Sequence, residues 1–459
     1  MKHAITTHAE ALAWLDSLES LGIQPGLERI TALLARLGNP HLDRPSVLVA
    51  GTNGKGSVVA FLASILAEAG VRAGVYTSPH LVRFEERIRI GGEPIPAAGL
   101  AAVTSEVAAA VGALGRAGGV TPTYFEATTA MAFLHFARRR VPIAILEIGM
   151  GGRYDATNVA QPLACAITPV SLDHTQWLGG TVAEIAAQKA GILKPGVPAV
   201  TGRQDDAALA VIRDAAARAG APLFETAACA VTPAGAVTPA GAAPPGAALA
   251  DAALPDPASF GLRLPDGALY PHLDLALRGD HQVDNAVVAV LLARILRGRG
   301  FPAIDDGAIA RGLPRAVWPG RLELLPRAPG DGGPDLLLDG AHNPAGCAIL
   351  AAYLLRHQAA RKRRVLLFAA MRDKPAAEML GILRAAAEAV VVTGLPVVRG
   401  TPPADLARLA SAAGFTVEVE PDPAAAIGRA RDRAGTGGLV VASGSLYLVG
   451  EIRRRRLPG

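Results

Sequence analysis

Short apolar runs alternate with longer stretches of helical periodicity along the first half of the chain. The runs that predict strands cover residues 47–50, 71–76, 143–148 and 163–168, and the helical stretches include residues 9–18, 27–37, 58–66 and 97–114. Nearly continuous apolar strands that alternate with helices are typical of a parallel sheet covered by helices on both faces. We therefore predict an α/β fold that begins with a doubly wound parallel sheet.

The same alternation restarts after about residue 318. Further strands are predicted at residues 335–338, 364–369, 389–392, 416–419 and 438–441, with a helix between successive strands. A chain of 459 residues is too long for one ordinary hydrophobic core. The pattern therefore predicts a larger domain over residues 1–316 and a smaller, Rossmann-like α/β domain over residues 317–459.

A change of composition separates the two halves of the larger domain. Residues 227–257 are rich in Ala, Gly and Pro and contain the repeat Val-Thr-Pro-Ala-Gly-Ala at residues 231–236 and 237–242. Such a segment has too little apolar surface to form a packed element, so we expect a flexible surface insertion. Regular structure is expected to return with a strand over residues 270–277 and a helix over residues 285–296.

A glycine-rich segment with one lysine follows the first apolar run. Residues 51–57 read Gly-Thr-Asn-Gly-Lys-Gly-Ser, and the next residues have the pattern of a helix. In this context the backbone N–H groups and the helix N-terminus face a bound phosphate. The spacing differs from G-x-x-x-x-G-K-[ST], because two residues separate Gly51 from Gly54-Lys55 and Gly56 precedes Ser57. The segment predicts a P-loop-type ATPase domain, and a tight glycine turn with a solvated lysine is the alternative.

Four polar features occupy the carboxyl ends of the strands, where ligands bind in open parallel sheets: the glycine-rich segment with its lysine, Ser78, Glu147 and His174. Glu147 lies inside an apolar strand, where an unpaired charge is costly, so it is either a metal ligand or part of an ion pair. Ser78 alone could be a turn hydroxyl, and His174 alone could be a hydrogen-bonded loop histidine. Lys189, on an apolar helix, either extends to solvent or is held in the site.

Composition narrows the class of protein further. The chain is 51% hydrophobic and 19% charged with a net charge of +5, and its arginine clusters lie at helix or chain ends, so we infer no nucleic-acid binding. Three widely separated cysteines form no C-x-x-C pair, which argues against a disulfide framework or a zinc site. The N-terminal residues have no apolar signal region, and no uninterrupted apolar stretch approaches the ~20 residues of a membrane span. We expect a cytoplasmic protein without a membrane partner.

Six motifs in order resemble one enzyme family. They are residues 51–57, Thr-Ser-Pro-His-Leu at 77–81, Glu-Ile-Gly-Met-Gly-Gly-Arg at 147–153, Leu-Asp-His at 172–174, Gln-Lys-Ala-Gly-Ile at 188–192 and Asp-Gly-Ala-His-Asn-Pro at 339–344. Together they resemble the bacterial folylpolyglutamate synthase/dihydrofolate synthase family, a branch of the Mur-type ATP-dependent amide ligases. The unusual spacing of residues 51–57 is itself the form found in that family.

The resemblance implies roles for individual residues. Catalytic roles would fall to Lys55, His174 and Lys189, the last of these carbamylated. The nucleotide would be bound by Thr52, Asn53, Gly54, Lys55, Gly56, Ser57, Asn285, Arg321 and Asp339. Two magnesium ions would be held by Ser78, Glu147, His174 and Lys189. The pterin substrate would contact Ile23, Gln24, Pro25, Thr123, Tyr124, Phe125, Glu126, Tyr154, Asp155 and Ala156.

The resemblance also implies a reaction. ATP would phosphorylate a carboxylate of dihydropteroate or of a reduced folate, and the amine of L-glutamate would displace the phosphate from the acyl phosphate. His342 and residues 371–374 could face the incoming glutamate or phosphate. The enzyme is expected to be a monomer that carries out both additions, although Tyr154 stands where the family usually has Leu. A monofunctional folylpolyglutamate synthase, a cell-wall Mur ligase and a non-catalytic nucleotide-binding regulator are the alternatives.

Overall fold

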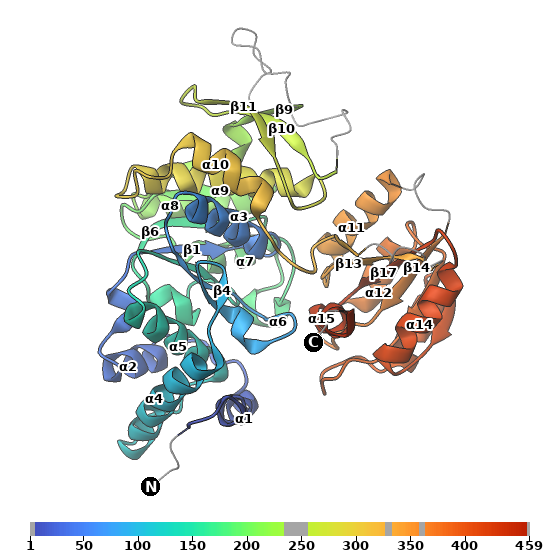
Figure 1. Cartoon of the computed structure of the whole chain (residues 1–459), viewed down its shortest axis with the longest axis horizontal. Coiled ribbons are helices and arrows are strands. Elements are labelled where there is room, and N and C mark those ends of the chain that lie inside the picture. The colour runs from blue at the N-terminus through green and yellow to red at the C-terminus, as the bar shows by residue number, and fades with distance from the viewer. Residues whose placement is uncertain (1–4, 234–255, 326–332, 358–362, 457–459) are drawn as a thin grey trace. The chain divides into compact units, whose positions relative to one another are not determined.

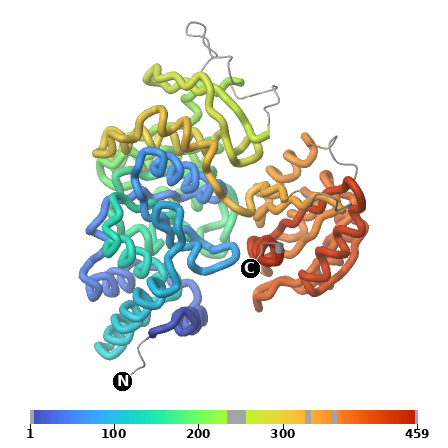
Figure 2. Tube along the Cα trace, in the orientation of Figure 1, coloured from blue at the N-terminus to red at the C-terminus, as the bar shows by residue number. Residues whose placement is uncertain are grey.

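The computed structural model describes residues 5–233, 256–325, 333–357 and 363–456 (Figure 1). The chain forms two compact units, and each includes more than one stretch of sequence. The first comprises Met1–Ser171, Thr175–Ala276 and Gln282–Val317, and the second comprises Leu172–His174, Leu277–His281 and Trp318–Gly459. Figure 2 traces this path from the blue N-terminal part to the red C-terminal part.

An eight-stranded sheet forms the centre of the first unit. Its strand order is β4-β3-β2-β5-β1-β6-β7-β8. Six strands pair in parallel, namely β1 (Ser46–Ala50), β2 (Gly74–Tyr76), β5 (Ala144–Glu147), β6 (Pro162–Ile167), β7 (Ala199–Thr201) and β8 (Leu223–Glu225). The antiparallel strands β3 (Ile88–Ile90) and β4 (Glu93–Pro94) end the sheet on one side. The predicted doubly wound α/β fold is confirmed.

Helices cover this sheet and bury its apolar side chains. They are α1 (His8–Leu18), α2 (Glu28–Arg36), α3 (Lys55–Glu68), α4 (Ala97–Arg116), α5 (Tyr124–Arg138), α6 (Thr175–Leu178), α7 (Val182–Ala190), α8 (Asp206–Arg218), α9 (His281–Arg297) and α10 (Asp306–Gly312). Helices α1, α2, α4 and α5 pack against one another, and their buried residues join those of the strands in one core. Among the described residues, α4 alone is long and apolar enough to cross a membrane, and 44% of its apolar window is buried in this core.

The predicted surface insertion begins later than the sequence suggests. Ala230–Pro233 forms β9, which pairs with β10 (Ser259–Arg263), and β11 (Leu269–Asp274) completes a three-stranded antiparallel sheet. Cys229 and Val231 are buried at the start of this sheet, so the interpretation of these residues as an unpacked loop is wrong. The rest of the predicted insertion, residues 234–255, lies outside the described residues.

The second unit is a smaller α/β structure. Its sheet has six strands, in the order β12 (Glu323–Leu325), β13 (Asp335–Leu338), β17 (Leu439–Ser443), β14 (Arg364–Phe368), β15 (Ala389–Val392) and β16 (Thr416–Val419). All pairs are parallel except β12 with β13. The helices are α11 (Pro344–Arg356), α12 (Ala376–Leu383), α13 (Pro403–Ala412), α14 (Pro423–Ala434) and α15 (Leu446–Arg456). Ligands bind at the carboxyl ends of the strands in such sheets, so we expect the functional residues of both units at those ends.

Candidate functional site

The glycine-rich segment connects β1 to α3, as the sequence predicts. Gly51 has a φ of 144°, and Gly54 has a φ of 89° directly before the first residue of α3, so both positions favour glycine. A Cβ atom on Gly51 would lie 1.8 Å from the Thr168 hydroxyl oxygen. The Thr52 N–H donates to the Pro169 carbonyl over 3.0 Å, which fixes the turn against the end of β6. The turn is therefore held in one position at the N-terminus of α3.

Two lysine side chains meet at the same carbonyl of this turn. Lys55 Nζ donates to the carbonyl oxygens of Gly51, over 3.2 Å, and Thr52, over 3.1 Å. Lys189, on α7, is 5% exposed, and its Nζ donates to the Gly51 carbonyl over 2.8 Å. Lys189 is thus held at the turn rather than extended to solvent. The two ammonium groups create a positive region where the sequence predicts phosphate binding.

Asn285 brings α9 to the same turn. The side chain is 3% exposed, and its Nδ2 donates to the Gln282 side chain over 3.0 Å. A Cβ atom on Gly54 would lie 2.4 Å from Asn285 Oδ1, so the amide lies directly against the backbone of the turn. The structure therefore brings together Lys55, Lys189 and Asn285 from three helices.

Ser78 and Glu147 are neighbours at the ends of β2 and β5. Glu147 is 6% exposed, and its Oε2 accepts a hydrogen bond from the Ser78 backbone N–H over 3.2 Å. A carboxylate and a hydroxyl are oxygen donors of the kind that Mg²⁺ prefers, so this pair fits the predicted metal. Within the described residues, no group of three His, Cys, Asp or Glu side chains could hold a metal ion, and the predicted ligand set relies instead on a serine and a lysine.

The segment that contains His174 belongs to the second unit. His174 has a φ of 51°, which is uncommon for a non-glycine residue. Its neighbour Asp173 accepts hydrogen bonds from Lys374 Nζ, over 2.6 Å, and from Asn343 Nδ2, over 3.2 Å. Burial alone would raise the pKa of Asp173, but the charges of His174 and Lys374 outweigh it and hold that pKa below its usual range. A carboxylate therefore fixes the segment that contains a predicted metal ligand.

Asp339 and His342 lie after β13 in the second unit. The Asp339 carboxyl accepts the backbone N–H groups of Leu322 and Ala341, each over 2.9 Å, and burial raises its pKa despite the nearby charge of Arg321. Burial lowers the pKa of His342 to about 4, so the ring is neutral near pH 7. Its Nδ1 lies 2.7 Å from the Gly340 carbonyl, and the proton of the neutral ring is therefore placed on Nδ1.

The residues predicted to contact the substrate come from three segments of the first unit. Residues 23–25 form a loop between Gly22 and Gly26, both at positive φ, and Ile23 is 43% exposed. Thr123 and Glu126 form a capping box at the start of α5. A Cβ atom on Gly149 would lie 2.5 Å from Phe125, so this ring lies against the turn that ends β5.

The third segment meets the same turn. Asp155 is buried and accepts hydrogen bonds from the Met150 N–H, over 2.9 Å, and from the Thr157 N–H, over 3.0 Å. Burial raises the pKa of Asp155, and these donors oppose the rise. Ala156 is 4% exposed and Tyr154 is 51% exposed. Asp155 thus fixes the turn through its own hydrogen bonds, while Tyr154 is the accessible member of its segment.

Two residues of the site have no assigned role in the sequence analysis. Arg29, on α2, pairs with Glu126 over 3.1 Å, and Asp173 pairs with Lys374 over 2.6 Å. The partners lie 97 and 201 residues apart in the chain. Arginine and aspartate are common residues, so the local sequence pattern does not identify Arg29 or Asp173 as part of a site. The chain has six lysines in 459 residues, so the scarcity of this residue type is a usable signal for Lys374 but not for Arg29 or Asp173.

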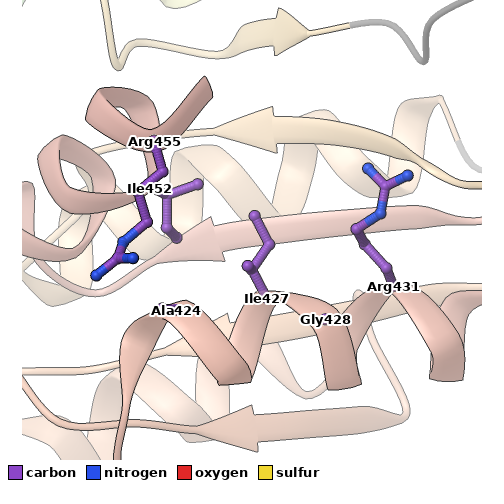
Figure 3. Close-up of a pocket in the computed structure, with 6 residues that line it drawn as sticks. All are labelled: Ala424, Ile427, Gly428, Arg431, Ile452 and Arg455. Atoms are coloured by element: carbon purple, nitrogen blue, oxygen red, sulfur yellow. The ribbon is translucent and has the colours of Figure 1, made fainter. Parts of the chain in front are cut away.

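A cavity of about 330 Å³ in the second unit lies apart from these residues. Its lining includes Ile427, Ile452, Arg431 and Arg455, as Figure 3 shows, together with Ala424 and Gly428. None of the predicted site residues lines it. Arg455 Nε donates to Glu451 over 2.8 Å, so its charge is already compensated.

Comparison with known proteins gives consistent results. Residues 320–446 match the family model described as Mur ligase, glutamate ligase domain. The dihydrofolate synthase/folylpolyglutamate synthase of Bacillus subtilis is 36% identical over 453 residues, which cover 98% of this chain and 99% of the relative. A folylpolyglutamate synthase of Mycobacterium tuberculosis, solved with ADP and AMPPCP, has a TM-score of 0.85 at 32% identity and covers 98% of this chain and 100% of its own. E. coli FolC, solved with DHPP and ADP, has a TM-score of 0.82 at 29% identity and covers 99% of each chain.

Proposed function

The chain belongs to the dihydrofolate synthase/folylpolyglutamate synthase family of Mur-type ligases, and we propose that it joins L-glutamate to dihydropteroate and to reduced folates. It is an ATP-dependent ligase. The observation that carries the proposal is the convergence of Lys55 and Lys189 on the Gly51 carbonyl, in a glycine turn at the start of α3. The N-terminus of α3 would bind the phosphates, and Lys55 would provide positive charge beside them.

The reaction needs a better leaving group than the substrate offers. A carboxylate oxygen attacks the γ-phosphorus of ATP, the bond from that phosphorus to the bridging oxygen breaks, and ADP leaves. The glutamate amine then attacks the carbonyl carbon of the acyl phosphate, loses a proton, and inorganic phosphate departs with the bonding electron pair. Lys55 compensates the negative charge on the transferring group.

Lys189 is proposed to act as a carbamate. The neutral amine attacks CO₂, one proton is released, and a carboxylate is formed on Nζ. Support comes from the burial of this amine beside the turn, where it is 5% exposed. An arginine could not replace it, because a guanidinium does not form a stable carbamate. Lys189→Arg should therefore lose most activity, and intact-protein mass spectrometry at high bicarbonate should find the CO₂ adduct only in the wild type.

Magnesium is proposed to bind at Ser78, Glu147, His174 and the carbamate of Lys189. The hydrogen bond from the Ser78 backbone N–H to the Glu147 carboxylate, which keeps these two residues side by side, supports this assignment. When bound, Mg²⁺ neutralises charge on the phosphate oxygens of the nucleotide. We also propose that the first unit binds ATP and the pterin, that the second contributes Arg321 and Asp339 to nucleotide binding, and that glutamate reacts there. A monomeric, cytoplasmic enzyme remains our expectation.

A steady-state assay tests the proposal directly. Purified protein with ATP, magnesium, glutamate and dihydropteroate should release ADP and phosphate in equal amounts and form dihydrofolate. With a reduced folate it should add further glutamate, detected by mass spectrometry. Turnover with the reduced folate but not with dihydropteroate would leave only the monofunctional synthase. Lack of turnover with both substrates would refute the proposed function, and a Lys55→Ala variant provides the inactive control.

A further inference from the structure

One arginine joins two of the segments that line the candidate pterin site. Arg29 lies in the first turn of α2, and its side chain is 15% exposed. Its Nε donates to Glu126 Oε2 over 3.1 Å, and its Nη2 donates to the Gln24 carbonyl. Gln24 belongs to the loop of residues 23–25, and Glu126 belongs to the first turn of α5. A single guanidinium therefore fixes the loop and the helix at the same time.

The Glu126 carboxylate depends on this contact. Its side chain is 5% exposed. Oε2 also accepts the Thr123 backbone N–H over 2.7 Å, whereas Oε1 is buried and accepts no hydrogen bond from the described residues. A buried carboxylate is costly unless it is paired, so removal of Arg29 leaves a charge held by one backbone amide. The carboxylate would then rotate or take up a proton, and the start of α5 would move.

The loop depends on the same side chain for a different reason. Gly22 and Gly26 enclose it at φ values of 62° and 133°, so the backbone on both sides is adapted to an unusual path. The Gln24 side chain donates back to the Leu21 carbonyl over 3.1 Å, which leaves the Gln24 carbonyl as the group through which Arg29 holds the loop. Without that anchor, Ile23 and Pro25 lose their fixed position relative to α5.

We propose that Arg29 is a positioning residue that sets the affinity of the enzyme for the pterin part of its substrate. The inference rests on the proposed function, because residues 23–25 and 123–126 are the proposed pterin contacts. Arg29 reaches its two acceptors from two different nitrogens, Nε and Nη2, whereas the donors of a lysine all start from the single Nζ atom. At the glycine turn of residues 51–54, Lys55 and Lys189 donate to the Gly51 carbonyl and Asn285 donates to Gln282, whereas Arg29 donates to Glu126 and Gln24, so nucleotide binding should be independent of Arg29.

The test measures the Michaelis constants of dihydropteroate and ATP separately. Arg29→Ala should raise the KM of dihydropteroate by roughly 10-fold to 100-fold and change the KM of ATP by less than about 2-fold. Arg29→Lys keeps the charge beside Glu126 but cannot also hold Gln24, and it should raise the KM of dihydropteroate by a smaller factor of roughly 3 to 10. Arg213→Ala, which removes an exposed arginine paired with Glu225, is the matched control and should leave both constants unchanged.

The outcomes separate the two proposals. If the wild type is inactive with every pterin substrate, the proposed function is refuted. If the wild type uses only a reduced folate, the KM values of the Arg29 variants and the wild type are compared with that folate instead of dihydropteroate. If the wild type is active and both Arg29 variants keep the wild-type KM for the pterin, the positioning role is refuted. An equal rise in both KM values, or loss of kcat alone, would also refute it. Should Arg29→Ala fail to fold in a thermal melt, Arg29→Lys decides the question.

Discussion

The close approach of Asn285 to the phosphate turn gives a prediction whose size can be worked out. Gly54→Ala places a Cβ atom at a φ of 89°, and a left-handed backbone costs a non-glycine residue about 1–2 kcal/mol. The same Cβ would lie 2.4 Å from Asn285 Oδ1. The buried amide must then shift and strain its 3.0 Å hydrogen bond to Gln282, for about 1–3 kcal/mol more. The free energy of unfolding of the first unit should fall by about 2–5 kcal/mol.

Gly70→Ala is the matched control for the backbone term. Gly70 has a φ of 73° at the C-terminal end of α3, where the Val71 N–H donates to the Leu66 carbonyl as in a left-handed helix cap. Nothing lies within 4 Å of the added Cβ atom, so only the conformational cost of about 1–2 kcal/mol applies. Both substitutions restrict the unfolded chain equally, so that contribution cancels in the comparison. In an Asn285→Ala background, the extra cost of Gly54→Ala should disappear.

Urea unfolding provides the assay. A chain of two units need not unfold in one step, so the first unit is followed by Trp14, which packs against its core, in a variant with Phe at positions 177 and 318. The midpoint and slope give the free energy of unfolding. If Gly54→Ala and Gly70→Ala cost the same within about 0.5 kcal/mol, or if Asn285→Ala leaves the difference intact, the steric reasoning is wrong.

Other predictions concern pH, the second core and a surface pair. Burial, and to a smaller extent the charges of Arg139 and Arg138, lower the pKa of His135 from 6.5 to about 4. The contribution of neutral His135 to the free energy of unfolding is therefore complete above pH 6.5 and is lost as the pH falls through 4. His135→Gln should therefore lose less stability than the wild type between pH 7 and pH 4 in urea unfolding. Phe368→Ala removes a fully buried ring, and Trp318 fluorescence should report about 3–5 kcal/mol less stability in the second unit. A double-mutant cycle on the exposed Arg213–Glu225 pair should give a coupling of about 1 kcal/mol or less.

The sequence predicted the long central strands well because they are apolar throughout. Strands β13, β15 and β16 have the predicted bounds, and β1, β5, β6 and β14 differ from prediction by one residue at one or both ends. In the eight-stranded sheet, the strands that were not predicted are β3, β4, β7 and β8, which are two or three residues long and lie toward the edges. A run of three residues has no periodicity, so their pairing is decided by tertiary contacts.

The start of the composition-biased segment shows a second limit. Residues 231–233 read Val-Thr-Pro inside a segment rich in Ala, Gly and Pro, yet they belong to β9. They pair with strand β10, whose Leu262 lies opposite Val231. The composition of the segment gives no sign of this pairing, because the partner strand is distant in sequence.

For the site, the sequence located groups that depend on local chain geometry. The phosphate turn needs glycine at fixed positions beside one lysine, and that requirement is visible in the residues themselves. The contacts of Arg29 with Glu126 and of Asp173 with Lys374 join residues 97 and 201 positions apart. No local pattern records such pairs, because each side chain on its own is compatible with a solvated surface.

The Asp173–Lys374 pair has a consequence for how the protein is made. Residues 172–174 leave the ribosome 201 positions before Lys374, which is about 10–40 s at usual rates of translation. During that interval most residues of the second unit, which lie after Trp318, have not yet been synthesised. The second unit can therefore fold only after most of the chain has been made. A fragment that starts at Trp318 would leave Lys374, whose side chain is 8% exposed, without its 2.6 Å partner. A truncated version would therefore keep only the 3.7 Å contact of Lys374 with Asp373 among the ion pairs described for this side chain.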